Sequence, residues 1–420
     1  MKTYEAYKDG DGFWIKKIPI QWSFGSLNLL VDFVMGQAPH SSSYNQDGIG
    51  EIFIKTGDFG KIRPTAKWFT TSPLVYGSKE DVFICVVGAT AGKVNLGLNG
   101  TISRSIAALR PRDKVVQSYL FYFLSYNYIR LNDSSQGSAQ GIINKDILSS
   151  IKLPLPSLKE QTQIAAYLDH KTHIIDALIE KKEQLIKKLQ AQRQATINEA
   201  VTKGLNPNVK MKDSGIEWLG EVPEHWEVVK LKYLVDHSTE KGDGDSEFNI
   251  ALENIESKTG KLIFSESKNF SGELKVFKKG NILFNKLRPY LSKVLLAPKD
   301  GECVSELLVF EAIGDIIDSN YLFQKLSSEQ IISIVDSSTY GAKMPRASID
   351  FILNLPIPLP SKEEQLQIAT KIEIYKSRIY DSTKGLQNSI KKLKSYRQSI
   401  ISEAVTGKID VRDWQAPSKN

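Results

Sequence analysis

The stretch Gly88–Val94 reads GATAGKV and follows the apolar run Val82–Val87. A strand that leads into a glycine-rich turn ending in Gly-Lys is the arrangement by which nucleotide-binding loops hold phosphates. The spacing does not fit that chemistry, because Gly88 and Gly92 are one residue too close together and Val94 stands where a hydroxyl would hold Mg²⁺. We therefore expect no ATP site in this stretch.

A second candidate for chemistry is the pair His170 and His173, which lie one helical turn apart beside Asp169 and Asp176. These residue types can ligate a metal, but the equivalent positions of a later repeat of this segment hold no histidine. We expect solvated side chains there and no metal site. The sequence contains no G-x-S-x-G, H-E-x-x-H or G-x-G-x-x-G fingerprint, and no Asn-Pro-Pro-aromatic motif of amino-methyltransferases.

The composition favours a protein of several domains with an anionic partner. The chain has 420 residues and a net charge of +7, so we expect two or three domains and a polyanionic ligand. The alternative is a soluble protein whose basic excess has no such role. Cys85 and Cys303 are the only cysteines, and the N-terminus lacks a signal-like apolar core, which together favour a reduced, cytoplasmic protein.

The chain contains an internal repeat. The segment LPLPSLKEQTQIA (Leu153–Ala165) recurs as IPLPSKEEQLQIA (Ile357–Ala369), 204 residues later. The same offset relates KKLQAQRQATINEAVTKG (Lys187–Gly204) to KKLKSYRQSIISEAVTGK (Lys391–Lys408). Between these segments the two halves diverge. A duplication of this kind predicts two similar units related by an approximate two-fold axis.

The repeated segments read as long helices. Each begins with a Ser-x-x-Glu capping box, at Ser157 and at Ser361, in which the glutamate is expected to reach back to the serine N–H. Residues 158–203 contain neither glycine nor proline, and Gly204 and Gly407 are natural stops. A helix of that length would span roughly 65–70 Å at 1.5 Å per residue and needs a partner along its length.

Heptad spacing indicates that the two helices are each other's partner. The apolar row of the second helix is expected to comprise Ile372, Ile379, Leu386, Leu393 and Ile400, and that of the first Leu168, Ile175, Leu178, Leu185 and Leu189. We infer an antiparallel coiled coil that separates two globular domains. The alternative is two independent helices, each covering its own domain.

The divergent segments are rich in short apolar runs bounded by turn residues, which predicts strands over residues 50–112 and 248–311. A helical stretch follows each, near residues 117–126 and 319–335. The expected fold class is therefore α+β. The predicted domains are residues 1–152, a first long helix over 153–205, residues 206–356, and a second long helix with a tail over 357–420.

This plan, together with LPLPSLKEQTQIA, INEAVTKG and KMKDSGIEWLGEVPEHWEVVKLKYL (Lys210–Leu234), closely resembles the specificity subunit of type I restriction–modification enzymes across the whole chain. The resemblance implies that each divergent segment is a target-recognition domain for one half of a bipartite DNA site. It implies that the helices set the spacer and dock two modification subunits, which use S-adenosylmethionine to methylate adenine. Restriction subunits would add ATP- and Mg²⁺-dependent translocation and cleavage. The chain itself would bind no cofactor and be non-catalytic.

Three alternatives remain open at this point, one of which is a self-sufficient enzyme that would methylate or cut DNA without partners; we expect the purified chain to do neither. The chain could be the recognition subunit of another bipartite-site system of the type IIB kind, which cuts on both sides of its target. It could also be a coiled-coil scaffold that binds DNA without sequence preference.

Candidate DNA contacts are basic and amide side chains in the divergent segments, because Lys and Arg bind phosphates and Arg, Lys, Asn and Gln also read base edges. For any of them, a solvated surface charge is the alternative. The predicted set is Lys61, Arg63, Lys67, Lys93, Arg104, Gln136 and Gln140 in the first domain, and Lys286, Arg288, Tyr290, Lys293, Lys343 and Arg346 in the second.

Candidate contacts for the modification subunits are polar helix residues that repeat while the domains diverge. Intramolecular packing is the alternative reason for their repetition. The predicted set is Glu160, Gln161, Arg193, Gln194, Glu364, Gln365, Arg397 and Gln398.

Overall fold

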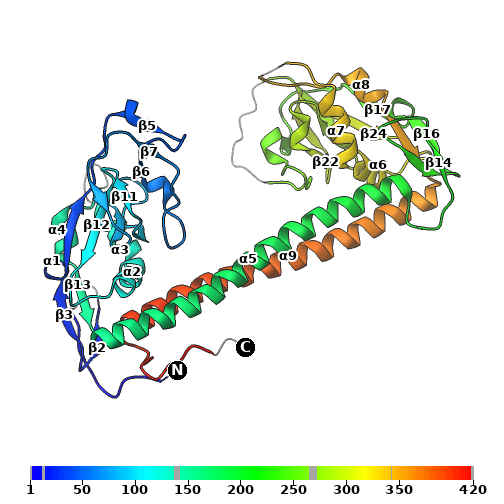
Figure 1. Cartoon of the computed structure of the whole chain (residues 1–420). Helices are drawn as coiled ribbons and strands as arrows, with labels where there is room; N and C mark the ends of the chain where they lie inside the picture. The colour runs from blue at the N-terminus through cyan, green and yellow to red at the C-terminus, as the bar shows by residue number, and fades with distance from the viewer. Residues whose placement is uncertain (1, 12–14, 137–141, 264–271, 342, 418–420) are drawn as a thin grey trace. The chain divides into compact units, whose positions relative to one another are not determined.

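The structure is a computed structural model that describes residues 2–11, 15–136, 142–263, 272–341 and 343–417. The chain forms two compact units. Unit 1 consists of Met1–Lys182 with Asn388–Asn420, and unit 2 of Glu183–Gln387. Each unit combines an α+β domain with one end of each of two long helices (Figure 1), which confirms the predicted fold class.

The domain of unit 1 is built on two sheets that face each other. The main sheet has the strand order β10–β9–β12–β4, with all neighbours antiparallel. Its strands are β4 (Val31–Met35), β9 (Val82–Cys85), β10 (Val94–Leu96) and β12 (Ile106–Pro111). The second sheet has the order β5–β7–β6–β11–β8, formed by β5 (Tyr44–Asn45), β6 (Glu51–Ile54), β7 (Phe69–Thr70), β8 (Tyr76–Gly77) and β11 (Gly100–Ile102).

Both faces of the main sheet in unit 1 are covered, so its central strands are continuous apolar runs. Ile54 and Ile102 of the second sheet pack on Phe83 and Ile106 on one face. Helix α2 (Gln117–Tyr126) contacts β9, β10 and β12. Every residue of β9 is buried.

Unit 2 repeats this plan with different residues. Its main sheet, β17–β24–β21–β22, has the same antiparallel arrangement, and its second sheet has the order β18–β20–β23–β19. The strands are β17 (Val235–Ser238), β18 (Lys241–Gly242), β19 (Asn249–Ile250), β20 (Leu274–Phe277), β21 (Ile282–Asn285), β22 (Val294–Leu296), β23 (Gly301–Val304) and β24 (Leu307–Ala312). Helices α6 (Ser319–Leu326) and α7 (Glu329–Ser337) replace the single helix predicted over 319–335, because Ser328 caps a new helix start.

The remaining elements also come in pairs. Hairpin β1 (Tyr7–Asp9)–β2 (Lys17–Pro19) matches β14 (Met211–Asp213)–β15 (Glu221–Pro223), and β3 (Ser23–Ser26)–β13 (Lys152–Leu155) matches β16 (Glu227–Lys230)–β25 (Pro356–Leu359). The short helices are α1 (Leu27–Leu30), α3 (Tyr128–Gln136), α4 (Lys145–Ser150) and α8 (Ile349–Leu353). Five 3₁₀ turns complete the described part of the chain: η1 (Ser41–Ser43), η2 (Thr56–Asp58), η3 (Leu231–Tyr233), η4 (Leu252–Asn254) and η5 (Pro289–Leu291).

The two long helices are continuous. Helix α5 (Leu158–Lys203) has 46 residues and α9 (Lys362–Val405) has 44. Gly204 and Gly407 follow them in the left-handed conformation (φ +78° and +71°), as the sequence predicts for helix stops. Both helices begin later than the predicted segments at 153 and 357, because the Pro-x-Pro stretches before them form β13 and β25.

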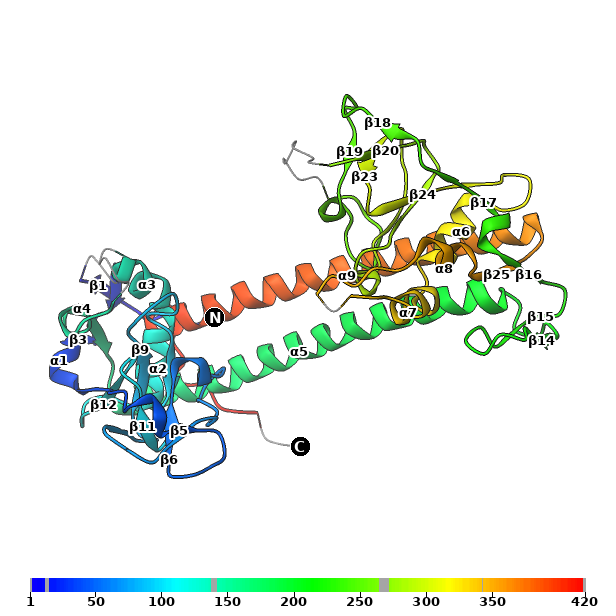
Figure 2. The ribbon, with the colours of Figure 1, turned by 90° about the horizontal axis from the view of Figure 1, so that it is seen from above.

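Within each unit the two helices run antiparallel. In unit 1 the first half of α5 lies beside the last turns of α9, where Arg397 Nε donates to Asp176 Oδ1 at 3.0 Å. In unit 2 Arg193, near the end of α5, lies with Lys376 of α9 around a small cavity. Figures 1 and 2 show the two ribbons side by side. The antiparallel coiled coil predicted from the heptads is confirmed.

The predicted apolar row of α5 is wrong in its middle. Leu178 and Leu185 are exposed (43% and 45%), although Leu168 and Ile175 are buried as predicted. Ile179 is buried and Ile186 is half-buried in their place, so the seam continues at positions that complete a seven-residue spacing. The row predicted for α9, from Ile372 to Ile400, is buried or half-buried throughout.

The starts of the two helices differ from the predicted capping boxes. Ser157 and Ser361 accept from the N–H groups of Glu160 and Glu364, both at 3.3 Å, as expected. The glutamate side chains instead accept hydrogen bonds from tryptophan Nε1, from Trp22 to Glu160 at 3.1 Å and from Trp226 to Glu364 at 2.9 Å.

Candidate nucleic-acid interface

The glycine-rich stretch after β9 is the turn of a β-hairpin, since β9 pairs directly with β10. Lys93 at its end donates from Nζ to the Phe59 carbonyl at 3.1 Å. Lys293, the equivalent lysine of unit 2, donates to the Leu252 carbonyl at 2.6 Å. Each lysine therefore ties the hairpin to a neighbouring 3₁₀ turn, η2 or η4, which gives both a structural role. Contact with DNA stays a prediction for both.

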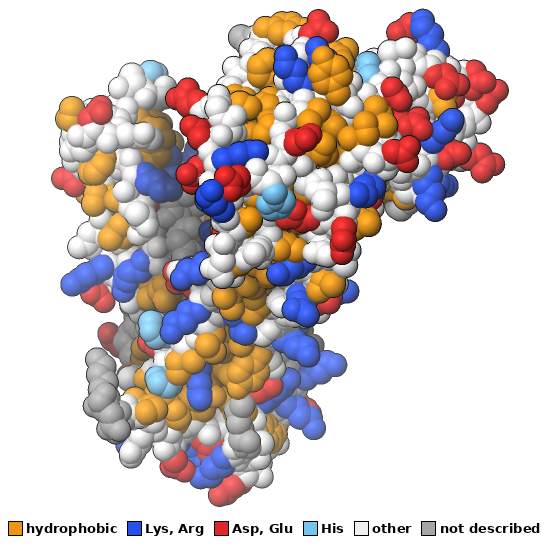
Figure 3. Space-filling model, turned by 90° about the vertical axis from the view of Figure 1, so that its right-hand side faces the viewer, with side chains coloured by type: hydrophobic (Ala, Val, Ile, Leu, Met, Phe, Trp, Pro, Cys, Tyr) orange, Lys and Arg blue, Asp and Glu red, His pale blue; other side chains and the backbone are white. Residues whose placement is uncertain are grey.

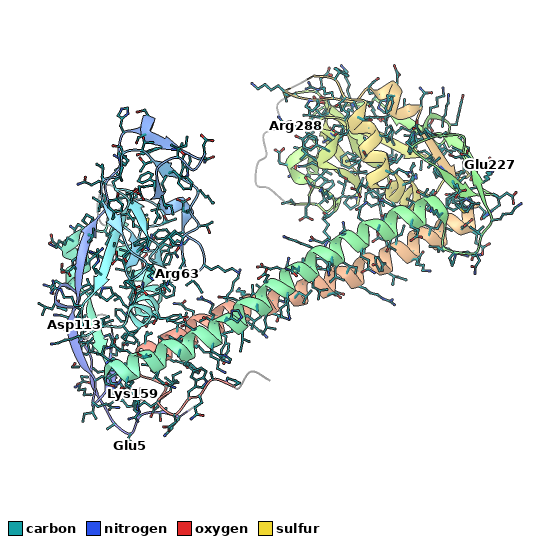
Figure 4. The ribbon with its side chains drawn as sticks, in the orientation of Figure 1. Glu5, Arg63, Asp113, Lys159, Glu227 and Arg288 are labelled. Atoms are coloured by element: carbon teal, nitrogen blue, oxygen red, sulfur yellow. The ribbon has the colours of Figure 1, made fainter. Side chains whose placement is uncertain are left out.

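The other basic residues predicted in the first domain lie on surface loops. Arg63 donates from Nη1 to the main-chain carbonyls of Lys79 (3.2 Å) and Gly97, so two loops fix its direction (Figure 4). Lys61 and Lys67 are exposed. Gln140 and the side chain of Gln136 lie outside the described residues.

Arg104 lies at a hollow of about 650 Å³ in unit 1, between the loop after β4, the end of β6 and the turn between β11 and β12. Lys55, at the end of β6, lines the same hollow. Its Nζ lies 3.6 Å from the ring centroid of Trp68 and 4.3 Å from that of Tyr44. Burial among these groups lowers the pKa of Lys55. Lys55 is not among the residues predicted from the sequence, because a lysine between a short strand and a 3₁₀ turn has no distinctive spacing.

The predicted residues of the second domain meet where two loops are bound to each other. The Arg288 N–H donates to the Pro345 carbonyl at 2.7 Å, and the Ala347 N–H donates to the Lys286 carbonyl at 3.0 Å. Arg288 adopts a left-handed conformation (φ 50°) that is strained for a residue with a side chain, and its Nη2 lies 3.4 Å from the Lys343 carbonyl.

The loop pair of unit 2 exposes both basic and aromatic groups. Tyr290 and Lys343 are exposed. Arg346 forms an ion pair with Glu306, with Nη2 2.7 Å from Oε1, and this contact raises the pKa of Arg346. Lys286 and Arg346 line a second hollow of about 520 Å³. The structure therefore brings five of the six predicted residues of this domain near one pair of loops. The sixth, Lys293, has its ammonium at η4.

Four of the predicted partner contacts are largely withdrawn from the surface. Gln161 and Gln365 are each 1% exposed and bind main-chain groups of their own domains, such as the N–H of Val116 at 2.8 Å and that of Asp318 at 2.7 Å. Glu160 is buried, and the side chain of Glu364 is 24% exposed. Their repetition thus has an intramolecular cause, and burial removes the basis for assigning them to a partner surface.

The other four predicted partner contacts lie within the paired helices. Arg193 is half-buried and donates from Nη2 to the Lys258 carbonyl at 3.0 Å, whereas its equivalent Arg397 binds Asp176. Gln194 donates to Asn198 at 3.2 Å, and Gln398 is exposed. Contact of these residues with a partner stays a prediction.

The exposed side chains of the described residues are of mixed character. Figure 3 shows lysine and arginine side chains distributed among neutral, apolar and acidic ones on one face. Among the described residues, no group of three or more His, Cys, Asp or Glu side chains could hold a metal ion. No helix in the described part of the chain is long and apolar enough to cross a membrane.

Comparison with known proteins gives the same repeat as the sequence. The family model for the type I restriction modification DNA specificity domain matches twice, over residues 19–188 and 223–392. Over 97% of each chain, 27% of residues are identical to the type I restriction enzyme MjaVIII specificity subunit of Methanocaldococcus jannaschii. The EcoDI specificity subunit of Escherichia coli is 23% identical, over 95% of this chain and 91% of that one.

Two solved structures share the fold. One, from a study of complex assembly and conformational transition of the type I restriction–modification system, matches with a TM-score of 0.72 at 15% identity, over 93% of this chain and 99% of the other. The crystal structure of the HsdS subunit from Thermoanaerobacter tengcongensis matches with a TM-score of 0.54 at 15% identity, over 93% and 98%. At this identity the likeness concerns the fold.

Proposed function

The chain belongs to the family of type I restriction–modification DNA specificity proteins, and from this we propose that it is the subunit that selects the DNA target of such a complex. Each α+β domain reads one half of a bipartite site. The observation that carries the proposal is the double match to the family model, which starts at residues 19 and 223 and thus has the offset of the sequence repeat.

The paired helices are proposed to set the spacer between the two half-sites. Half-sites on one face of B-DNA lie about 34 Å apart or a multiple of this distance. Continuous helices of 46 and 44 residues, at 1.5 Å per residue, are long enough for such a spacing. Their length, rather than the identity of the domains, would then fix the gap in the recognised sequence.

The proposal extends to partners and cofactors. We infer that two modification subunits dock on the helices and use S-adenosylmethionine to methylate adenine, and that restriction subunits add ATP- and Mg²⁺-dependent cleavage. This chain contributes no catalytic group of its own. It is expected in the cytoplasm, where thiols stay reduced, because both cysteines are free. Cys303 is buried, and burial raises the pKa of its thiol to about 12.

The test is to map adenine methylation in DNA from cells that carry this chain and its modification subunit. A two-part motif with a fixed gap is expected, because two domains read one duplex. Cells with the modification subunit alone are the control and should lack that motif. Methylation without a bipartite motif would contradict the proposal. Methylation or cleavage by the purified chain alone would show an enzyme instead.

A further inference from the structure

The hollow at Arg104 differs chemically from two hollows of unit 2. Its described lining contains three basic side chains, His40, Lys55 and Arg104, and no Asp or Glu. Two hollows of unit 2, of about 520 and 420 Å³, each include acidic side chains: Asp350 in the first, and Glu199 and Glu329 in the second. The chemistry of the unit 1 hollow therefore selects for an anion.

Neutral donors complete this lining. The hydroxyl residues Ser41, Thr56, Ser103 and Ser105 surround the cations. Hydroxyls and guanidinium groups are the usual protein donors to phosphate oxygens. At about 650 Å³, the hollow is larger than a single phosphate needs, so it can also accept the sugars on either side of a phosphodiester.

Lys55 is held in place by its neighbours before any ligand binds. Its Nζ lies over Trp68 and Tyr44, and 5.5 Å from the ring centroid of Phe53. Tyr44 stacks on Phe53 with ring centroids 4.8 Å apart, and its hydroxyl donates to the Pro39 carbonyl at 2.7 Å. A lysine in solution must give up rotamer freedom to bind a phosphate, whereas this ammonium has already done so.

The main chain at Lys55 is fixed as well. Asp58, the buried acid of η2, accepts a hydrogen bond from the Lys55 N–H at 2.8 Å, and its charge partly opposes the effect of burial on the ammonium. Arg104 follows directly after the buried Ser103, so the main chain that carries its exposed side chain is held in place by packing. The two cations thus come from separate elements with defined positions.

We propose that this hollow binds a backbone phosphate of the target DNA, with Lys55 and Arg104 as its cations and Trp68 and Tyr44 as residues that position Lys55. The proposal rests on the proposed function, and it identifies a surface of unit 1 that contacts the DNA backbone. The equivalent of Lys55 in unit 2 is Ala251, at the same place before its 3₁₀ turn, so this contact belongs to one domain only.

The experiment measures binding of the full-length chain, purified with its modification subunits, to a duplex that carries the methylated motif and to a scrambled duplex. Lys55→Gln and Arg104→Gln should each weaken binding to both duplexes about tenfold, because a phosphate contact does not depend on sequence. Each should also lower the slope of log K against log salt by about 1. Lys55→Arg should retain most of the affinity, since an arginine also stacks on Trp68.

Trp68→Leu separates positioning from direct contact. It should weaken binding while the salt slope stays as in wild type, because the number of phosphate contacts is unchanged. Lys79→Gln is the matched control: Lys79 is an exposed lysine of the same unit that faces Glu80 at 3.9 Å, and its loss should change neither quantity. Circular dichroism and thermal unfolding confirm that each variant folds.

The outcomes separate this proposal from the one on which it rests. If wild type prefers the motif but the Lys55 and Arg104 variants bind as wild type does, the hollow is not a DNA contact and the function stands. If inorganic phosphate binds wild type and not the variants, while DNA affinity is unchanged in all, the hollow is a site for free anions and the proposal is overturned. If wild type shows no preference for the motif, the proposed function itself fails.

Discussion

At the scale of single residues, two glutamates explain much of the repeat. The side chains of Glu160 and Glu364 do not bind the serine N–H at the start of their helices. Each accepts a hydrogen bond from a buried tryptophan of its own domain. A buried carboxylate without donors would cost several kcal/mol, and in both domains the tryptophan N–H is one of the groups that prevent this. The two glutamates therefore recur in the internal repeat because each binds a tryptophan of its own domain. Recurrence in the sequence alone does not distinguish this structural role from contact with another subunit.

Lys325 is a residue whose replacement should stabilise the protein. It is fully buried on α6, and its Nζ donates to Thr202 and Gln330, at 3.1 and 3.2 Å. Burial lowers its pKa from 10.5 to about 7. Above pH 10.5 the residue is neutral whether folded or unfolded. As the pH falls towards 7, only the unfolded chain gains the proton, so stability is lost, by on the order of 3–5 kcal/mol.

We expect Lys325→Met to raise the free energy of unfolding at pH 7, and to remove this loss between pH 10.5 and pH 7. The measurement is urea unfolding of both proteins at several pH values. Phe123, the equivalent residue of unit 1, is also fully buried, which shows that an apolar side chain suits the position. An unchanged difference between the two proteins across this pH range would mean that Lys325 does not carry the pH dependence.

At the scale of elements, the length of the two long helices follows from their capping and stop residues, and their stability comes from packing against each other. Helix α9 passes through Gly385 without a break, although glycine costs about 1 kcal/mol relative to alanine inside a helix. No other group lies within 4 Å of where a Cβ on Gly385 would be, and the residue is exposed. Helix α9 therefore stays helical at Gly385 because apolar residues on either side of this glycine pack in the seam between the two helices.

Gly385→Ala should stabilise the protein by up to about 1 kcal/mol, read as a higher midpoint of thermal unfolding. Gly407→Ala is the opposite case. Gly407 has φ +71°, and a Cβ there would collide with Pro19 Cδ, so this variant should be destabilised. If both substitutions shifted the midpoint in the same direction, the distinction between helix interior and helix stop would be wrong.

The elements also show what the sequence could predict. The ends of α5 follow from a serine cap at Ser157 and a glycine stop at Gly204, which are local signals, although the predicted helical segment began earlier, at residue 153. The hollow that we propose for a DNA phosphate depends on Lys55 and Arg104, which lie 49 residues apart and come together because β6 pairs in parallel with β11. Long-range strand pairing leaves no periodic pattern, so the hollow could not be predicted.

At the scale of the whole molecule, helix α5 carries apolar side chains that are exposed to solvent. Ile174 and Leu178 lie one turn apart on α5 and are 42% and 43% exposed. Contiguous exposed apolar patches mark contacts with other proteins, and we propose that these two neighbouring side chains form part of one. This pair is a more direct candidate for the modification subunits than the buried glutamines.

Leu178→Glu should abolish co-purification of the modification subunit, because a carboxylate would be buried in the contact, while stability changes by less than about 0.5 kcal/mol at an exposed position. Lys181→Glu, an exposed charge change on the same helix, is the control and should leave assembly intact. Retained assembly with Leu178→Glu would move the contact to another part of the chain.

The division of the chain into units has a consequence for its synthesis. Unit 2 is one continuous stretch, Glu183–Gln387, whereas unit 1 combines Met1–Lys182 with Asn388–Asn420. Domains that emerge first from the ribosome usually fold first. Here part of unit 1 is translated only after unit 2, so Tyr167 of the N-terminal part gains its contact with Trp414 only once that later stretch has been made.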